Sequence, residues 1–143
     1  MSGTGSGTII LDSIRAKDGE SISYSLHNSS RMPNRRLVLI HSLAMDGSFW
    51  SKNIPALIEC ANVLTIDCRG HGSSSKTTKK YSVESFASDL EDVLNHLKWD
   101  DAIIVGASMG GSVSLAFAIA HPKRTKGLGL IDTTAWYGAD APQ

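Results

Sequence analysis

Residues 106–110, Gly-Ala-Ser-Met-Gly, form a G-x-S-x-G motif, and this is the pattern in the chain that most directly indicates chemistry. The motif directly follows an apolar run, Ala102–Val105, and directly precedes residues 111–120, which favour a helix. Between a strand and a helix such a serine occupies a sharp, strained turn, and its hydroxyl stands clear of the sheet. Glycines flank it because side chains two residues away would collide in that turn. Ser108 is therefore a candidate acyl-transfer nucleophile, the alternative being a glycine-rich turn without chemistry.

Two backbone N–H groups are candidates for binding the negative oxygen that forms during acyl transfer. A helix that begins behind Ser108 points its positive dipole end at the site, which favours a developing oxyanion. We expect one donor from the residue after the serine, Met109, and assign the other to Leu43, in the loop after the run Leu37–Ile40. The alternative for this loop is a plain strand-end turn. We interpret His41, in the same loop, as structural rather than as a catalytic base.

The segment Asp67–Ser74 follows another apolar run and contains Gly70 and Gly72, whose spacing matches part of a dinucleotide-binding fingerprint. No helix opens directly after it, so we interpret it as a tight structural turn in which Asp67 and Arg69 pair. The sequence contains no G-x-x-x-x-G-K-[ST] phosphate loop. Its histidines are too scattered for a zinc site, and we expect no cofactor and no metal; they are His27, His41, His71, His96 and His121.

The composition is that of an ordinary globular domain. The chain has 143 residues, 41% hydrophobic and 20% charged, with 14 basic and 14 acidic residues and no net charge. This balance gives no reason to expect nucleic acid or an anionic membrane as a partner. We expect residues 1–8, rich in Gly, Ser and Thr, to form a flexible tail that lacks the apolar stretch of a secretory signal. Two cysteines without framework spacing fit a reducing compartment, so we expect a cytoplasmic protein.

The order of apolar patterns predicts an α/β fold. Residues 8–26 predict an antiparallel hairpin, because apolar residues flank an Asp18-Gly19 turn signal and then alternate with polar ones. Residues 28–36 predict a loop. Four continuous apolar runs then indicate strands of a mostly parallel sheet that are buried on both faces; they are Leu37–Ile40, Val63–Ile66, Ala102–Val105 and Leu128–Ile131.

Three helices are expected between these runs. Apolar residues with a 3.6-residue period extend from Val83 to Leu97, and Ser82 is placed to cap this helix while Tyr81 packs on Phe86. Residues 49–58 predict a short helix that Pro55 breaks or restarts, and Gly111–Ala120 predict a third that ends before Pro122. Strands and helices in alternation indicate right-handed crossovers.

Three of these segments resemble, in order and spacing, the first half of α/β-hydrolase-fold enzymes: residues 39–43, residues 67–74 and residues 106–111. Within that superfamily the chain looks most like the 3-oxoadipate enol-lactonase-like branch, on residues 41–50 and 130–138. The resemblance implies a serine hydrolase that acts on a carboxylic ester or lactone through an acyl-enzyme on Ser108. A serine at this turn argues against the dehalogenase and epoxide-hydrolase relatives, which carry an aspartate there.

The chain departs from this family at two places. Ser42 stands where many relatives have a glycine, and only 35 residues follow Ser108. The family order is serine, then acid, then histidine. Asp132 ends the last strand, where some relatives place the acid, but we read it as a structural aspartate, and no histidine follows it. We therefore expect residues 9–143 to be the N-terminal portion of the domain, with a sheet truncated after about the sixth strand and without the lid and the C-terminal half.

Three functions are compatible with this sequence. The first is a serine hydrolase whose substrate is a small ester or lactone and whose isolated chain is inactive for want of acid and histidine. The second is a non-catalytic α/β-hydrolase-like binding module, and the third is half of a split enzyme that another chain completes. Because the run Leu128–Ile131 is built for burial, we expect it to promote self-association or to bind a complementing chain.

Overall fold

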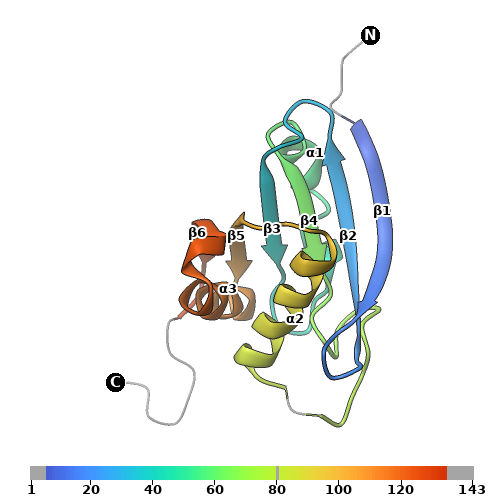
Figure 1. The fold of residues 1–143 in the computed structure, drawn as a ribbon, viewed down its shortest axis with the longest axis vertical. Helices are drawn as coiled ribbons and strands as arrows, with labels where there is room; N and C mark the ends of the chain where they lie inside the picture. Colours follow the sequence, from blue (N-terminus) through green and yellow to red (C-terminus); the bar gives the residue numbers. More distant parts are fainter. Residues whose placement is uncertain (1–5, 80, 135–143) are drawn as a thin grey trace.

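A computed structural model, which describes residues 6–79 and 81–134, contains one six-stranded sheet in the order β1-β2-β4-β3-β5-β6 (Figure 1). β1 and β2 pair antiparallel, as do β2 and β4, whereas the pairs β3–β4, β3–β5 and β5–β6 are parallel. The fold class predicted from the sequence is confirmed. The strands are β1 (Ser6–Arg15), β2 (Ser21–Ser29), β3 (Arg36–Ile40), β4 (Asn62–Ile66), β5 (Ala102–Ala107) and β6 (Thr125–Ile131).

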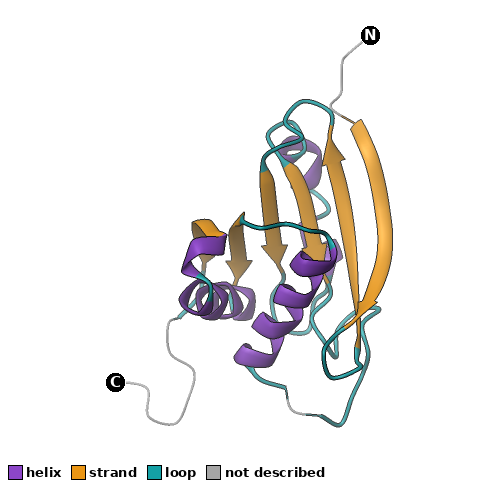
Figure 2. Ribbon diagram, viewed as in Figure 1, coloured by secondary structure: helices purple, strands orange, loops and turns teal. Residues whose placement is uncertain are grey.

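Helices cover the two faces of the sheet unequally. The larger core lies between the sheet and two long helices, α2 (Val83–His96) and α3 (Met109–Ala120), which stand in front of the strands in Figure 2. A smaller core on the other face packs Trp50 and the short helix α1 (Ile54–Leu57) over β3, β4 and β5. The remaining helices are single 3-10 turns, η1 (Gly47–Trp50) and η2 (Pro122–Arg124). No helix in the described part of the chain has the length and apolar content needed to cross a bilayer.

The leading hairpin is confirmed and is longer than predicted. Gly19 takes a φ of 91° in the turn between its strands, a conformation that glycine adopts without strain. β1 begins at Ser6, which pairs with Ser29, so residues 6–8 belong to the strand rather than to a tail. β2 extends into the predicted loop because Ser29 N–H donates to the buried Asn62 side chain at 2.6 Å. Residues 1–5 lie outside the described part of the chain.

The expected helices are present with small shifts at their ends. Ser82 and Ser85 form a reciprocal capping box at the start of α2, and the Tyr81 and Phe86 rings lie 6.3 Å apart. The segment 49–58 divides into η1 and α1, with Pro55 in the first turn of α1, where proline is tolerated. α3 begins at Met109, two residues earlier than predicted, because the turn at Ser108 leads into the helix without a loop.

The predicted pairing of Asp67 with Arg69 is wrong. The Asp67 carboxylate instead accepts the N–H groups of Gly47, at 2.7 Å, and Ser73, at 3.0 Å, which ties the loop after β3 to the loop after β4. Arg69 is 4% exposed and forms two 2.7 Å hydrogen bonds to Asp89 of α2. A third, also 2.7 Å, reaches Asp18 in the hairpin turn. The buried Arg69 guanidinium therefore joins the hairpin, the segment after β4 and α2. The hydrogen bonds to Asp89 raise the pKa of this guanidinium.

β6 is an edge strand of the described sheet, as expected for a sheet that ends after about the sixth strand, and its apolar side chains are exposed there. Leu128, Leu130 and Ile131 are 39%, 45% and 46% exposed. β5 protects one edge of β6, and the other edge carries unpaired backbone groups among the described residues. Such an edge with exposed apolar side chains favours pairing with another strand.

We predict that Asp89→Asn lowers the free energy of unfolding by about 3 kcal/mol, because removing the buried partner of an ion pair leaves the Arg69 charge with only the more exposed Asp18 carboxylate. Urea denaturation measures this loss. Lys126→Ala is the matched control, since Lys126 is 67% exposed and lies 3.8 Å from Asp101. The control should cost less than about 1 kcal/mol. Equal effects of the two substitutions would contradict the structural role of the Arg69 pair.

We also predict that the purified chain self-associates through β6. Replacing both Leu128 and Leu130 by lysine should shift its sedimentation toward monomer, because charge on an edge strand opposes strand pairing. Met32→Lys changes an exposed apolar residue outside the sheet and serves as the control. A wild-type chain that stays monomeric at tens of micromolar and melts cooperatively contradicts this prediction.

Candidate active site

Ser108 lies at the junction of β5 and α3 in a conformation that is rare for residues with a side chain. Its φ and ψ are 53° and −115°, and it is half-buried at the N-cap position of α3. The turn closes tightly because a β-carbon on Gly106 would collide with the Gly110 carbonyl, and one on Gly110 with the Ile40 carbonyl. Strain of this kind costs about 1–3 kcal/mol and persists only where the surroundings enforce it.

The sheet register brings the loop after β3 beside this turn. Ile40, the last residue of β3, pairs with Gly106 of β5, so the segments that follow these two strands leave the sheet at the same edge. Leu43 lies in the first loop, and Met109 is the first residue of α3. Within the described residues neither of their N–H groups donates to a protein acceptor. Both N–H groups are therefore without a protein acceptor among the described residues, as candidate donors to an oxyanion must be.

His41 holds the loop after β3 in place. It is fully buried; its Nδ1 lies 2.8 Å from the Ser42 carbonyl, and its Nε2 lies 3.0 Å from the Cys68 N–H. A neutral ring satisfies both contacts when Nδ1 carries the proton and Nε2 accepts. Burial lowers the pKa of His41, which favours this neutral form. The same apolar surroundings raise the pKa of the Cys68 thiol to about 12, so this thiol is not a nucleophile.

Neither an acid nor a base accompanies Ser108 in the described part of the chain. No described Asp, Glu or His side chain forms a hydrogen bond with its hydroxyl. His121 lies at the far end of α3, where its Nε2 is 3.4 Å from Glu91. Asp132 follows β6 on the exposed surface with a φ of 45°. The arrangement can therefore supply a nucleophile and oxyanion donors, but not a general base.

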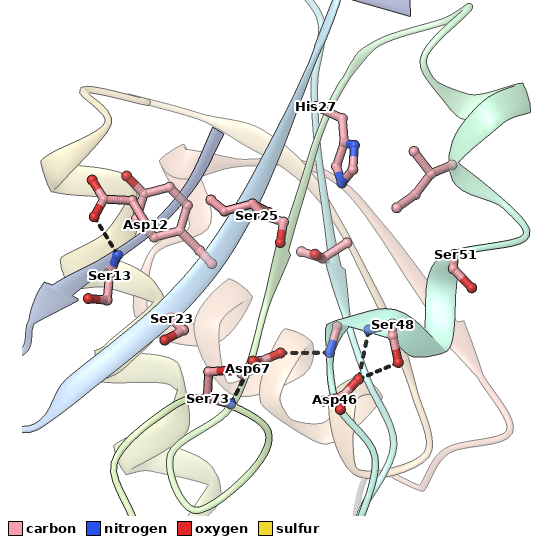
Figure 3. A pocket seen from close by; sticks show the side chains of 15 residues that line it. Asp12, Ser13, Ser23, Ser25, His27, Asp46, Ser48, Ser51, Asp67 and Ser73 are labelled. Atoms are coloured by element: carbon pink, nitrogen blue, oxygen red, sulfur yellow. Dashed lines mark hydrogen bonds between the residues drawn. The ribbon is translucent and has the colours of Figure 1, made fainter. Parts of the chain in front are cut away.

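A hollow of about 590 Å³ lies elsewhere (Figure 3). It opens between η1 and the strands β2 and β4, and Ser108, Leu43 and Met109 do not line it. Its walls include hydroxyls and carboxylates as well as apolar residues such as Leu11 and Ile54, and hydrogen bonds from Ser48 lower the pKa of the Asp46 carboxyl there. No three metal-ligating side chains come together anywhere among the described residues. This hollow has no group in common with the Ser108 turn.

Sequence analysis did not identify the contact between Ser108 and β6. The Ser108 N–H donates to the Ile131 carbonyl at 2.8 Å, across the β5–β6 boundary. The signal that was available is positional, because parallel neighbouring strands end at one edge of a sheet, and the residues after β5 and after β6 therefore meet there. The N–H of Ser108 is consequently occupied, whereas that of Met109 has no acceptor among the described residues.

We predict that protein stability falls as pH drops below about 6.5, the ordinary pKa of histidine, because the unfolded chain binds a proton that folded His41 resists. Above about pH 7.5 this contribution is constant. The free energy of unfolding measured from pH 8 to pH 5.5 tests this. His27 also has a pKa lowered by burial, so the measurement is repeated with His27→Gln. A flat profile in that variant contradicts the role given to His41.

Comparison with known proteins agrees with this architecture. The family model described as alpha/beta hydrolase fold matches residues 35–141. A soluble epoxide hydrolase from Corynebacterium sp. is 30% identical over 109 residues, which are 76% of this chain and 38% of that protein. The acetyltransferase component of the acetoin cleaving system from Pseudomonas putida is 37% identical over 95 residues, covering 66% of this chain and 26% of that protein.

Solved structures give the same result. A hydrolase from Pseudomonas aeruginosa superposes with a TM-score of 0.83 at 31% identity over 90% of this chain and 48% of that one. The enol-lactonase from Burkholderia xenovorans gives a TM-score of 0.81 at 29% identity, over 89% of this chain and 48% of that one. The chain thus spans less than half the length of each of these four proteins. From the family match, the sheet order and the turn at Ser108, we conclude that the chain belongs to the alpha/beta hydrolase fold family.

Proposed function

We propose that this chain is the nucleophile-bearing part of a serine hydrolase that acts on a carboxylic ester or lactone. The observation that carries the proposal is the backbone of Ser108, whose φ of 53° places a hydroxyl-bearing residue in a strained strand-to-helix turn. A glycine would adopt this conformation at lower cost, so a serine here indicates that the hydroxyl is needed.

In the proposed reaction the Ser108 oxygen attacks the carbonyl carbon of the substrate, and its proton passes to a base. The N–H groups of Leu43 and Met109 bind the oxygen that becomes negative. The alkoxide leaves with a proton, which gives an ester on Ser108. Water then hydrolyses that ester and returns the serine. No cofactor or metal is needed for these steps.

Two similarities support an ester or lactone substrate. The enol-lactonase from Burkholderia xenovorans is one structural neighbour, and another is described as an N-acyl homoserine lactone degrading enzyme, with a TM-score of 0.79 at 30% identity. Epoxide hydrolases are also among the relatives. A serine at position 108 favours the ester and lactone chemistry, and the finer assignment to a 3-oxoadipate enol-lactonase-like branch is part of this proposal.

The base and the acid have to come from outside residues 6–79 and 81–134. Because the chain covers 48% or less of the relatives described above, the groups that complete the site belong to further polypeptide or to a complementing chain. A non-catalytic binding module is the competing function. It predicts that the Ser108 hydroxyl has no reactivity beyond that of an exposed serine.

We predict slow, Ser108-dependent acylation of the purified chain. An alkyl fluorophosphonate should label Ser108, and hydrolysis of p-nitrophenyl acetate should be slower than with an intact serine hydrolase by a factor on the order of 10⁴–10⁶, because the base is missing. Labelling is located by peptide mass spectrometry, and turnover by nitrophenolate release.

Ser13→Ala, at an exposed serine of β1, is the control and should retain the labelling that Ser108→Ala abolishes. Labelling that persists in Ser108→Ala excludes the proposed nucleophile. Labelling of Ser108 no faster than that of Ser13 supports the binding module instead. Hydrolysis at the rate of an intact enzyme shows that the chain holds its own base.

A further inference from the structure

The segment at the end of β6, residues 131–134, forms hydrogen bonds with both the backbone N–H and the backbone carbonyl of Ser108. Ile131 accepts the Ser108 N–H at 2.8 Å. The hydroxyl of Thr133 donates to the Ser108 carbonyl at 2.6 Å. From these contacts we infer that Thr133 is a positioning residue for Ser108: its hydroxyl locks the strained turn that aims the serine side chain over the start of α3.

The contact is built into the packing of α3. Thr133 lies against Gly111, and a β-carbon at that glycine would come 2.5 Å from the Thr133 side chain. The third glycine of the Gly-x-Ser-x-Gly-Gly sequence therefore makes room for the threonine rather than for the turn itself. The neighbouring Ser112 hydroxyl donates to the Thr134 carbonyl at 2.9 Å, which fixes the same segment one residue further along.

The geometry explains why a hydroxyl is needed at position 133. The Ser108 carbonyl also accepts the Gly111 N–H at 2.9 Å, a bond that any turn into a helix can form. The Thr133 bond differs because it comes from the segment after β6, 25 residues along the chain, and so opposes relaxation of the turn as a whole. This hydrogen bond therefore offsets part of the strain in the Ser108 backbone.

Positioning by Thr133 should change the chemistry of the side chain at 108. Ser108 is the N-cap residue of α3 and makes no capping hydrogen bond through its side chain, but this side chain starts from the end of the helix whose partial positive charge stabilises an anion. Relaxation of the turn moves the side chain away from this end of the helix. The inference rests on the proposed function for its meaning in catalysis, but this electrostatic effect is independent of any hydrolase activity.

The test uses a thiol in place of the serine hydroxyl. In a Cys60→Ser background, S108C is the accessible thiol of the described chain, since Cys68 is buried and its thiol pKa is raised to about 12. The pH dependence of its alkylation by iodoacetamide gives the pKa of the thiol at position 108. Thr133→Val keeps the shape of the threonine and removes the donor, whereas Thr133→Ser keeps the donor and removes a methyl group.

We expect Thr133→Val to raise the thiol pKa by about 0.5 unit and Thr133→Ser to leave it within about 0.2 unit of the parent. In the protein that keeps Ser108, Thr133→Val should slow fluorophosphonate labelling by about five- to tenfold, and Thr133→Ser by less than about twofold. Thermal melts accompany each variant, so that a loss of fold is recognised.

An unchanged thiol pKa in a cooperatively folded Thr133→Val protein overturns the inference. Equal shifts in the Val and Ser variants also overturn it, because they assign the effect to packing rather than to the hydroxyl. Thr133→Ala provides a smaller replacement if the valine does not fold, and loss of fold in both shows a role in stability instead. Labelling of Ser108 bears only on the proposed function, whereas the thiol pKa decides the role of Thr133 whether or not Ser108 is labelled.

Discussion

The site depends on one backbone constraint, the left-handed turn at Ser108 between β5 and α3. A residue with a β-carbon at a φ of 53° is under strain, so the contacts made by neighbouring residues must stabilise this conformation by more than the strain destabilises it. They do so by close approach. Gly106 lets the chain fold back on α3, and Gly110 lets α3 lie directly on the exit of β3. Larger residues at these positions would force the helix off the sheet and release the turn.

His41 extends this constraint to the loops around the turn. Its ring joins the carbonyl of Ser42 to the N–H of Cys68, so the loop after β3 and the loop after β4 share one buried side chain. Asp67 forms a second link between the same loops through the N–H groups of Gly47 and Ser73. Leu43 lies between these anchors, inside a turn closed by the Met45 N–H and the Ser42 carbonyl at 3.2 Å, and its own N–H has no protein acceptor among the described residues.

The fold was predictable where it depends on local patterns. Continuous apolar runs marked β3, β4 and β5 to within two residues, since central parallel strands are apolar on both faces. Ser82 marked the start of α2 because a helix cap is decided by residues next to it. The exposure of Leu128 and Leu130 follows from the place of β6 at the edge of the sheet and not from its composition, so it was predictable only from the expectation that the sheet ends after about the sixth strand.

The candidate site was predictable only in part for a related reason. Ser108 is signalled by adjacent residues, whereas the partner of Arg69 lies 20 residues away on α2 and that of the Ser108 carbonyl lies 25 residues away after β6. Contacts of this kind are fixed by the order of strands, which brings the exits of β3, β5 and β6 to one edge. A one-residue slip of β6 against β5 would carry Ile131 away from the Ser108 N–H and turn its side chains to the opposite face. The geometry of the nucleophile turn therefore depends on the whole parallel sheet, although the motif that predicts it is six consecutive residues, 106–111.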